Sequence, residues 1–189
     1  MDIFWIVAAV VIVSIYLWYV SIVTKKNRAL EALSGIDVQL KQRSNLIPNI
    51  LTIAQKFMDH EKALLSEVTR LRTAAISDYD VNDSSSLMGH LQAAGQLDSA
   101  MGKLMVAVEA YPDLKSDSTM LHAQQTYNEV EANIAAARRF YNTSVTELNN
   151  SIQIFPGNLI AGLAKASTMP FYEVDEVSKA PVSAGDFLK

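Results

Sequence analysis

The chain has 189 residues, of which 50% are hydrophobic and only 19% are charged, and its formal net charge is −4. The absence of cysteine excludes disulfide frameworks, thiolate metal sites and cysteine nucleophiles, and the negative net charge argues against nucleic-acid binding by bulk electrostatics. Seven glycines and five prolines are few for this length, which disfavours turn-rich all-β folds and favours helix.

The first segment is an uncharged apolar run from Ile3 to Thr24. At about 1.5 Å per residue it reaches about 33 Å, enough to cross a hydrocarbon core of about 30 Å. A cleaved signal peptide is disfavoured, because no basic residue precedes the run and no A-x-A-like site ends it. We therefore predict a transmembrane anchor over residues 1–24. Its aromatic residues are expected at the two headgroup boundaries: Phe4, Trp5, Trp18 and Tyr19.

Charges on either side of the run indicate its direction in the membrane. Only Asp2 precedes it, whereas Lys25, Lys26 and Arg28 follow it at once. Basic flanks stay on the cytoplasmic side, so we expect a short N-terminus outside and the remaining chain in the cytoplasm. The three basic residues are expected to face anionic headgroups. Because they alone carry this prediction, a periplasmic bundle is the alternative.

Beyond Lys25, apolar residues recur at steps of three and four, which is typical of amphipathic helices. The first stripe predicts one helix over about 25–77, kinked at Pro48, and two helices broken near Asn45 are the alternative. A polar loop over 77–86 precedes a second helix, which ends at Tyr111 before Pro112. A third helix begins at a cap, Asp117 or Ser118, and runs to about 152, and a short helical piece follows over 156–166.

No run alternates with period two over strand length, so the sequence predicts an all-α fold. The transmembrane helix is expected to lead into an antiparallel three- to four-helix bundle with long helices over 25–176. The apolar stripes of the first and third long helices are about as long as each other, so these helices should pair along their length. Residues 177–189 are expected to form a disordered tail.

The residues offer no catalytic constellation. His60, His90 and His122 are placed on three different predicted helices, so a metal site that needs them together is disfavoured. The chain has no glycine-rich phosphate loop, G-x-S-x-G or H-E-x-x-H motif. We therefore predict a non-enzymatic protein without catalytic residues, cofactor, metal or evident small-molecule substrate. An enzyme would have to assemble its site from Asp37, Arg43, Arg138 and Asn142.

Three motifs stand out from the helical background. The first runs from Gly35 to Asn49, where Asp37 and Lys41 are spaced for an i,i+4 ion pair. The second is ARRFYN at residues 137–142, in which one arginine is expected to pair with a carboxylate such as Asp37, and Asn142 to satisfy a polar layer. The third, FPGNLI at residues 155–160, is expected to cap one end of the bundle, and contact with a membrane surface is the alternative.

Together, IDVQLKQRSNLIPNI, ARRFYNTSVTELNNSIQIFPGNLIA and FYEVDE resemble the LemA family of bacterial membrane proteins. Ser44 and Asn45 depart from a His-Asp pair that is common in the family. The resemblance implies a helical domain behind one transmembrane helix in the bacterial inner membrane, and it supplies no reaction. It also implies that the shared residues are structural: Asp37, Gln39, Lys41, Arg43, Pro48, Asn49, Arg138, Arg139, Tyr141, Asn142, Phe155 and Pro156.

Relatives within the family include a protein required for magnetosome membrane formation, which suggests a part in organising membranes. Our leading hypothesis is a scaffold that binds membrane lipids, self-associates as a homo-oligomer and organises the bacterial envelope. An adaptor for another membrane protein, such as a quality-control protease, is the alternative.

Overall fold

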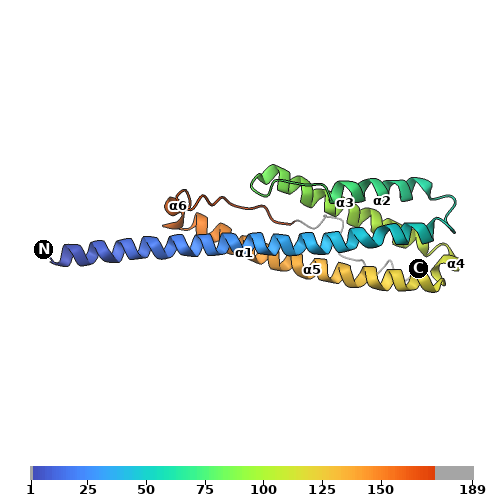
Figure 1. Ribbon diagram of the computed structural model, residues 1–189, viewed down its shortest axis with the longest axis horizontal. Coiled ribbons are helices and arrows are strands. Elements are labelled where there is room, and N and C mark those ends of the chain that lie inside the picture. Colours follow the sequence, from blue (N-terminus) through green and yellow to red (C-terminus); the bar gives the residue numbers. More distant parts are fainter. Residues whose placement is uncertain (1, 173–189) are drawn as a thin grey trace, which may run out of the picture.

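The computed structural model describes residues 2–172, and within this range all regular structure is helical. Its elements are α1 (Asp2–Ala54), α2 (Lys62–Ala75), α3 (Ser84–Val108), α4 (Pro112–Lys115), α5 (Ser118–Gln153) and α6 (Gly157–Ile160). The four longer helices run in alternating directions and form an elongated bundle, from which the first part of α1 projects (Figure 1). The predicted all-α antiparallel bundle is confirmed. The tail expected over 177–189 lies outside the described residues.

The helices are arranged in two pairs. The most extensive contact joins α1 to α5, and the next joins α2 to α3. The prediction that the first and third long helices pair along their length is therefore confirmed. Since α2 is much shorter than α3, it stops before the end of the bundle from which α1 projects (Figure 1).

Helix α1 passes from the apolar segment into the bundle without a break, and it also continues through Pro48. A proline cannot donate to the carbonyl four residues earlier, which here belongs to Ser44. The side chain of Arg72 on α2 replaces that donor, with its Nε 2.7 Å from the Ser44 carbonyl oxygen. The freed carbonyl is thus satisfied, and α1 runs on to Ala54.

The prediction of a single helix over 25–77 is wrong, and so is the alternative break near Asn45. The chain turns at residues 55–61, and α2 then runs back along the bundle. The turn was hidden because the apolar spacing continues through it: Ala54, Met58 and Leu65 are all buried. No proline or glycine marks the reversal.

Two aspartates start helices where short polar side chains accept backbone N–H groups. Asp83 accepts from the amides of Ser85 and Ser86 at the start of α3. Asp117 accepts from Thr119 and Met120 at the start of α5, which confirms the predicted cap. The short α4 between these helices was not predicted.

The apolar core has two clusters separated by a polar layer. The cluster distant from the projecting part of α1 joins the end of α1 to α2, the second half of α3 and the start of α5. The nearer cluster joins residues 29–40 of α1 to the start of α3 and the remainder of α5. Between them lie Arg43 and Ser44, which are fully buried on α1.

After α5 the chain makes a corner that contains α6 and then returns along the bundle. The peptide bond between Phe155 and Pro156 is cis. Gly157 and Ile160 are buried, and α6 contacts both α1 and α5. Residues 168–172 have no regular structure, yet they lie against α5 through hydrogen bonds described below.

Candidate functional site

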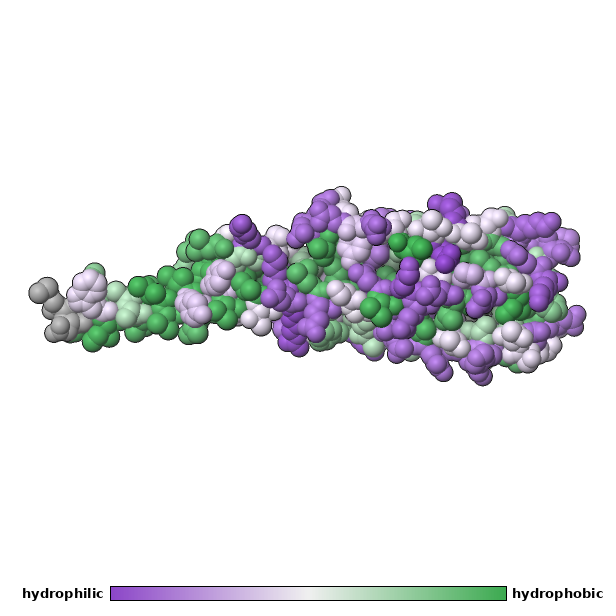
Figure 2. All heavy atoms as spheres, viewed as in Figure 1, coloured by the Kyte–Doolittle hydropathy of each residue, from purple (hydrophilic) through white to green (hydrophobic). Residues whose placement is uncertain are grey.

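The projecting part of α1 presents an apolar surface. Nearly every side chain from Ile3 to Val20 is exposed, and α1 is the one helix among residues 2–172 that is long and apolar enough to cross a membrane. Figure 2 shows this hydrophobic surface as a continuous projection from the more polar bundle. The predicted interface aromatics lie at its two ends: Phe4 and Trp5, with rings 5.7 Å apart, and Trp18 and Tyr19.

The three basic residues that follow this surface have different surroundings. The ammonium of Lys26 donates to the carbonyl of Lys165, at 2.9 Å. Arg28 pairs with Glu147 of α5 at 3.2 Å, and its guanidinium lies over the Phe140 ring. Lys25 is half-buried. Arg28 therefore joins α1 to α5, whereas both lysines remain close to the end of the apolar segment.

The polar layer between the two core clusters is an ion-pair cluster that joins three helices. Arg43 of α1 is fully buried and pairs with Asp98 of α3 and with Glu131 of α5, the latter at 3.2 Å. Its second terminal nitrogen donates to the carbonyl of Ala94 at 3.2 Å. Asp98 also pairs with Arg138 of α5. Two guanidinium groups and two carboxylates thus neutralise one another in the middle of the bundle.

Two tyrosines close this cluster. The Arg138 guanidinium lies 4.4 Å from the centre of the Tyr172 ring, in a cation–π contact. Burial, reinforced by the Glu131 carboxylate, raises the pKa of Tyr127 above its ordinary range. The expectation that an arginine pairs with Asp37 is wrong: Arg138 pairs with Asp98, a residue that the sequence did not single out.

Asp37 instead holds the loop after α2 against α1. Its carboxylate accepts from the Tyr79 hydroxyl at 2.7 Å and lies 3.2 Å from Nε2 of His90 on α3. The Tyr79 and His90 rings are stacked, with centroids 4.1 Å apart. Burial and the hydrogen bond to Asp37 raise the pKa of Tyr79. The ion pair expected between Asp37 and Lys41 is not among those formed by the described residues.

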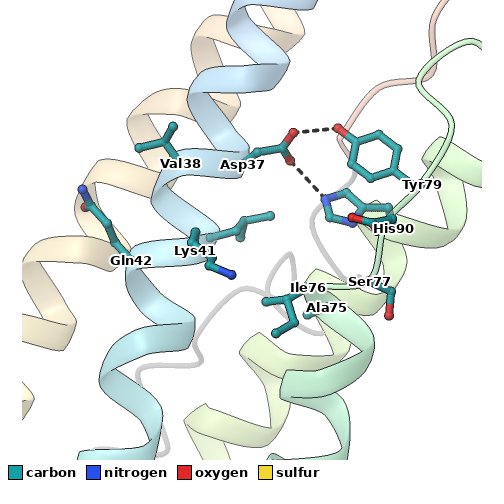
Figure 3. A pocket seen from close by; sticks show the side chains of 11 residues that line it. Asp37, Val38, Lys41, Gln42, Ala75, Ile76, Ser77, Tyr79 and His90 are labelled. Carbon is teal, nitrogen blue, oxygen red and sulfur yellow. Dashed lines mark hydrogen bonds and ion pairs between the residues drawn. The ribbon is translucent and has the colours of Figure 1, made fainter.

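The contacts of Asp37 with Tyr79 and His90, which we call the clamp, border a groove of about 530 Å³. The groove opens where α2 ends. Figure 3 shows Asp37 reaching from α1 to Tyr79 and His90, while Ile76 and Ala75 face the groove from the end of α2. The lining combines aliphatic side chains with a carboxylate whose oxygens already have partners. The rim of the groove also carries exposed polar side chains, among them Lys41, Gln42 and Asp78.

A ladder of side-chain amides holds the returning segment on α5. The Asn142 amide donates to the carbonyl of Tyr172 and accepts from its N–H, at 3.0 and 2.8 Å. Asn149, two turns away, makes the same pair of bonds to Met169, both at 2.9 Å. The Tyr141 hydroxyl donates to the Pro170 carbonyl at 2.8 Å. Asn142 thus binds the backbone of this segment and is not part of the polar layer that we expected it to satisfy.

The remaining motif residues have mainly exposed positions. Pro48 and Asn49 lie on the outside of α1, and Lys41 lies beside the groove. Gln39 is half-buried, and its side-chain oxygen has no hydrogen-bond partner. Arg139 is exposed on α5, and Phe155 and Pro156 form the corner before α6.

The residues of the possible enzyme site do not converge in one cleft. Arg43 and Arg138 meet in the packed polar layer, Asn142 binds the returning segment, and Asp37 closes the clamp. His60 lies in the turn after α1 and not on a helix, which corrects that part of the prediction. Within residues 2–172, no group of three His, Asp or Glu side chains is placed to hold a metal ion.

Sequence reasoning missed the partners that give the motif residues their roles. Asp98 and Glu131 directly follow the buried Leu97 and Val130, and a carboxylate at such a boundary position is indistinguishable from a solvated one until the arginine opposite is known. His90 lies next to Leu91 of the buried stripe. The spacing of seven between Asn142 and Asn149 was the one visible signal of a repeated contact along α5.

The chain is similar to one protein family and to three named bacterial proteins. The sequence profile of the LemA family matches residues 32–184. Two proteins of Paramagnetospirillum magneticum, called magnetosome protein MamQ 1 and MamQ 2, are each 22% identical to the chain over 194 residues. Magnetosome protein MamQ of Magnetospirillum gryphiswaldense is 21% identical over 191 residues. Each match covers 90% of this chain and 70% of the relative.

Proposed function

The chain belongs to the LemA family, and on that premise we propose that it is a membrane-anchored, non-enzymatic helical scaffold that assembles with copies of itself. The observation that carries this proposal is the continuity of α1. One helix of 53 residues forms both the apolar projection and the first helix of the bundle. No linker separates the two, so the bundle is held as a rod at a fixed angle to the membrane segment.

The chemistry of the polar groups supports a structural role. The Arg43–Asp98–Arg138 cluster is centred on a fully buried guanidinium, that of Arg43, and its charges are paired across three helices. Buried polar groups of this kind fix which helices pack and in which register. An active site, in contrast, requires polar groups that are free to meet a substrate.

The apolar segment and the charges that follow it support a location in the membrane and an orientation across it. We propose that the protein resides in the bacterial inner membrane with the bundle in the cytoplasm, since Lys25 and Lys26 follow the segment directly. The relatives are called magnetosome proteins, and a part in organising a membrane is compatible with a rigid rod anchored at one end.

We place the contact between copies on the outer face of the α1–α5 pair. The exposed residues there include small side chains, Gly35 on α1 and Ala132, Ala135 and Ala136 on α5. Small side chains allow two helices to approach closely. Neighbouring rods standing on the same membrane would then meet along their length.

Cysteine cross-linking of the full-length protein in membranes tests this proposal. The chain has no cysteine, so Ala136→Cys on α5 introduces a unique thiol, and Gln96→Cys on the exposed side of α3 is the matched control. We expect oxidation to link Ala136→Cys chains to each other, while Gln96→Cys chains remain monomeric. Equal linking at both positions contradicts the assigned face. If Ala136→Cys chains form no links with each other and link instead to a different membrane protein, the result would favour the alternative that the chain is an adaptor.

A further inference from the structure

The corner at residues 154–163 exposes an apolar surface that the bundle does not use. Phe155, Leu159 and Leu163 are 73%, 68% and 73% exposed, and Ile154 is also exposed. The opposite side of the same corner is anchored in the bundle, because Ile160 and Ala161 are buried. The corner is thus packed on one side and presents aliphatic and aromatic side chains on the other.

The backbone of this corner is held tightly. A Cβ atom at Gly157 would collide with the backbone carbonyl of Ser151, so only glycine allows this approach of α6 to α5. The amide of Gly157 donates to the Ile154 carbonyl at 2.7 Å. The exposed apolar side chains are therefore fixed in position by the fold and do not belong to a frayed end.

The corner lies at the level where α1 leaves the apolar segment. Ile22 is the first fully buried residue of α1, only four positions beyond Trp18, and α6 contacts α1. The hydrogen bond from Lys26 to the Lys165 carbonyl joins the end of the corner to α1 directly. Figure 1 shows α6 beside the part of the bundle from which α1 projects.

Depth along α1 places the corner at a headgroup layer. Tryptophan and tyrosine favour the membrane–water boundary, so Trp18 and Tyr19 mark the approach to it, and the uncharged run ends at Thr24. At about 1.5 Å per residue, Lys26 lies about 3 Å beyond Thr24, which is within a headgroup region of about 5 to 8 Å. The exposed side chains of the corner are beside this stretch of α1.

The charges nearby fit an anionic lipid surface. From Leu148 to Tyr172 the chain contains no aspartate or glutamate, and Lys165 is its one charged residue. Lys25 and Lys26 flank the same level on α1. Apolar side chains bordered by lysines are the composition of segments that lie in the interface of anionic membranes.

We infer that the corner at residues 154–163 is a second membrane contact, which inserts Phe155, Leu159 and Leu163 into the headgroup layer of the same bilayer that α1 crosses. The ligand is an anionic phospholipid surface. With two contacts, α1 and the corner, the rod has a defined rotation about its long axis relative to the membrane. The corner therefore does more than cap the bundle, which was the use expected from the sequence.

Spin labels on the full-length protein in vesicles of phosphatidylcholine and phosphatidylglycerol test this inference. Leu159→Cys carries the label at the corner, and Val106→Cys, at a side chain that is 74% exposed near the far end of α3, is the matched control. Two relaxation reagents report the surroundings of each label: oxygen concentrates in lipid, and a water-soluble nickel chelate remains in water. We expect the label at 159 to collide several-fold more with oxygen relative to the chelate than the label at 106 does.

Equal ratios at the two positions would overturn the inference. A label at 159 that is shielded from both reagents and broadened by a neighbouring label would also overturn it, because the corner would then be covered by a second copy of the chain. Both labelled positions are exposed, and retention of the helical circular dichroism signal establishes that each variant is folded. The measurement does not depend on self-assembly, so it separates this inference from the scaffold proposal.

Discussion

A single carbonyl, that of Ser44, shows how this bundle tolerates a proline in its longest helix. Pro48 deprives the carbonyl of its helical donor, and Arg72 from α2 supplies another at 2.7 Å. Ser44 is buried, so water cannot replace that donor, and a buried unpaired carbonyl costs free energy. The sequence predicted that Pro48 lies within a helix, whereas the compensating arginine is 24 residues away and belongs to a helix whose direction was not foreseen.

We expect Arg72→Ala to lower the free energy of unfolding by about 1 to 3 kcal/mol, because the Ser44 carbonyl is left unpaired. In a Pro48→Ala background the alanine N–H takes over that carbonyl, so the same Arg72→Ala change should cost clearly less. Urea unfolding of the four proteins, followed by circular dichroism, gives the coupling directly. Additive effects of the two substitutions would contradict the proposed compensation.

Gly157 is a second residue with a strict local requirement. Gly157→Ala forces a Cβ against the Ser151 carbonyl, and we expect it to lower stability by about 1 to 3 kcal/mol, the range of an overpacked site. Gly162→Ala is the control, since an added Cβ there meets no atom within 4 Å. If both variants melt at the same temperature, the corner is not held by this contact.

At the scale of elements, the polar layer matters most, because it joins α1, α3 and α5 between two apolar clusters. Helix periodicity and the cap at Asp117 predicted the courses of α3 and α5 well. The turn after Ala54 could not be predicted, because its apolar spacing is compatible with an uninterrupted helix. The partners of Arg43 were also beyond reach, since the residues that pair with it come from other helices and carry no sequence signal.

Removal of a buried partner should be much more costly than removal of an exposed one. We expect Arg43→Leu to lower the free energy of unfolding by about 3 kcal/mol, because Asp98 and Glu131 lose a shared buried counterion. Arg70→Leu, which breaks the exposed pair with Glu67 on α2, should leave the urea midpoint unchanged within error. Similar losses in both variants would show that the polar layer has no special role.

At the scale of the whole molecule, buried tyrosines connect bundle stability to pH. Burial raises the pKa of Tyr141 to about 12, above its ordinary value near 10. A raised pKa means that the folded state binds the proton more tightly than the unfolded chain, so this stability is complete below pH 10 and is lost as the pH rises towards 12. We expect a steep fall in thermal stability over that interval, and Tyr141→Phe should reduce its steepness. A melting temperature that stays constant up to pH 12 would contradict this role of Tyr141.

The overall architecture and the long apolar helix at the start of the chain were readable from the sequence, since long apolar runs and helical periodicity are strong signals of helix. The roles of the motif residues were not: Asp37 closes a clamp with Tyr79 and His90, and Asn142 binds the backbone of an irregular segment 30 residues away. Exposure of Phe155 at the end near the apolar segment also depends on how α6 packs. Such roles emerge from contacts distant in sequence, which periodicity does not encode.

The most direct test of the scaffold is the mass of the full-length protein in discs of its native membrane, measured one particle at a time. One chain has a mass of 20.8 kDa. If the protein is a scaffold, we expect particles that contain many copies of this chain and no other protein in fixed ratio. Discs that hold a single copy, or one copy bound to one copy of another membrane protein, would contradict it.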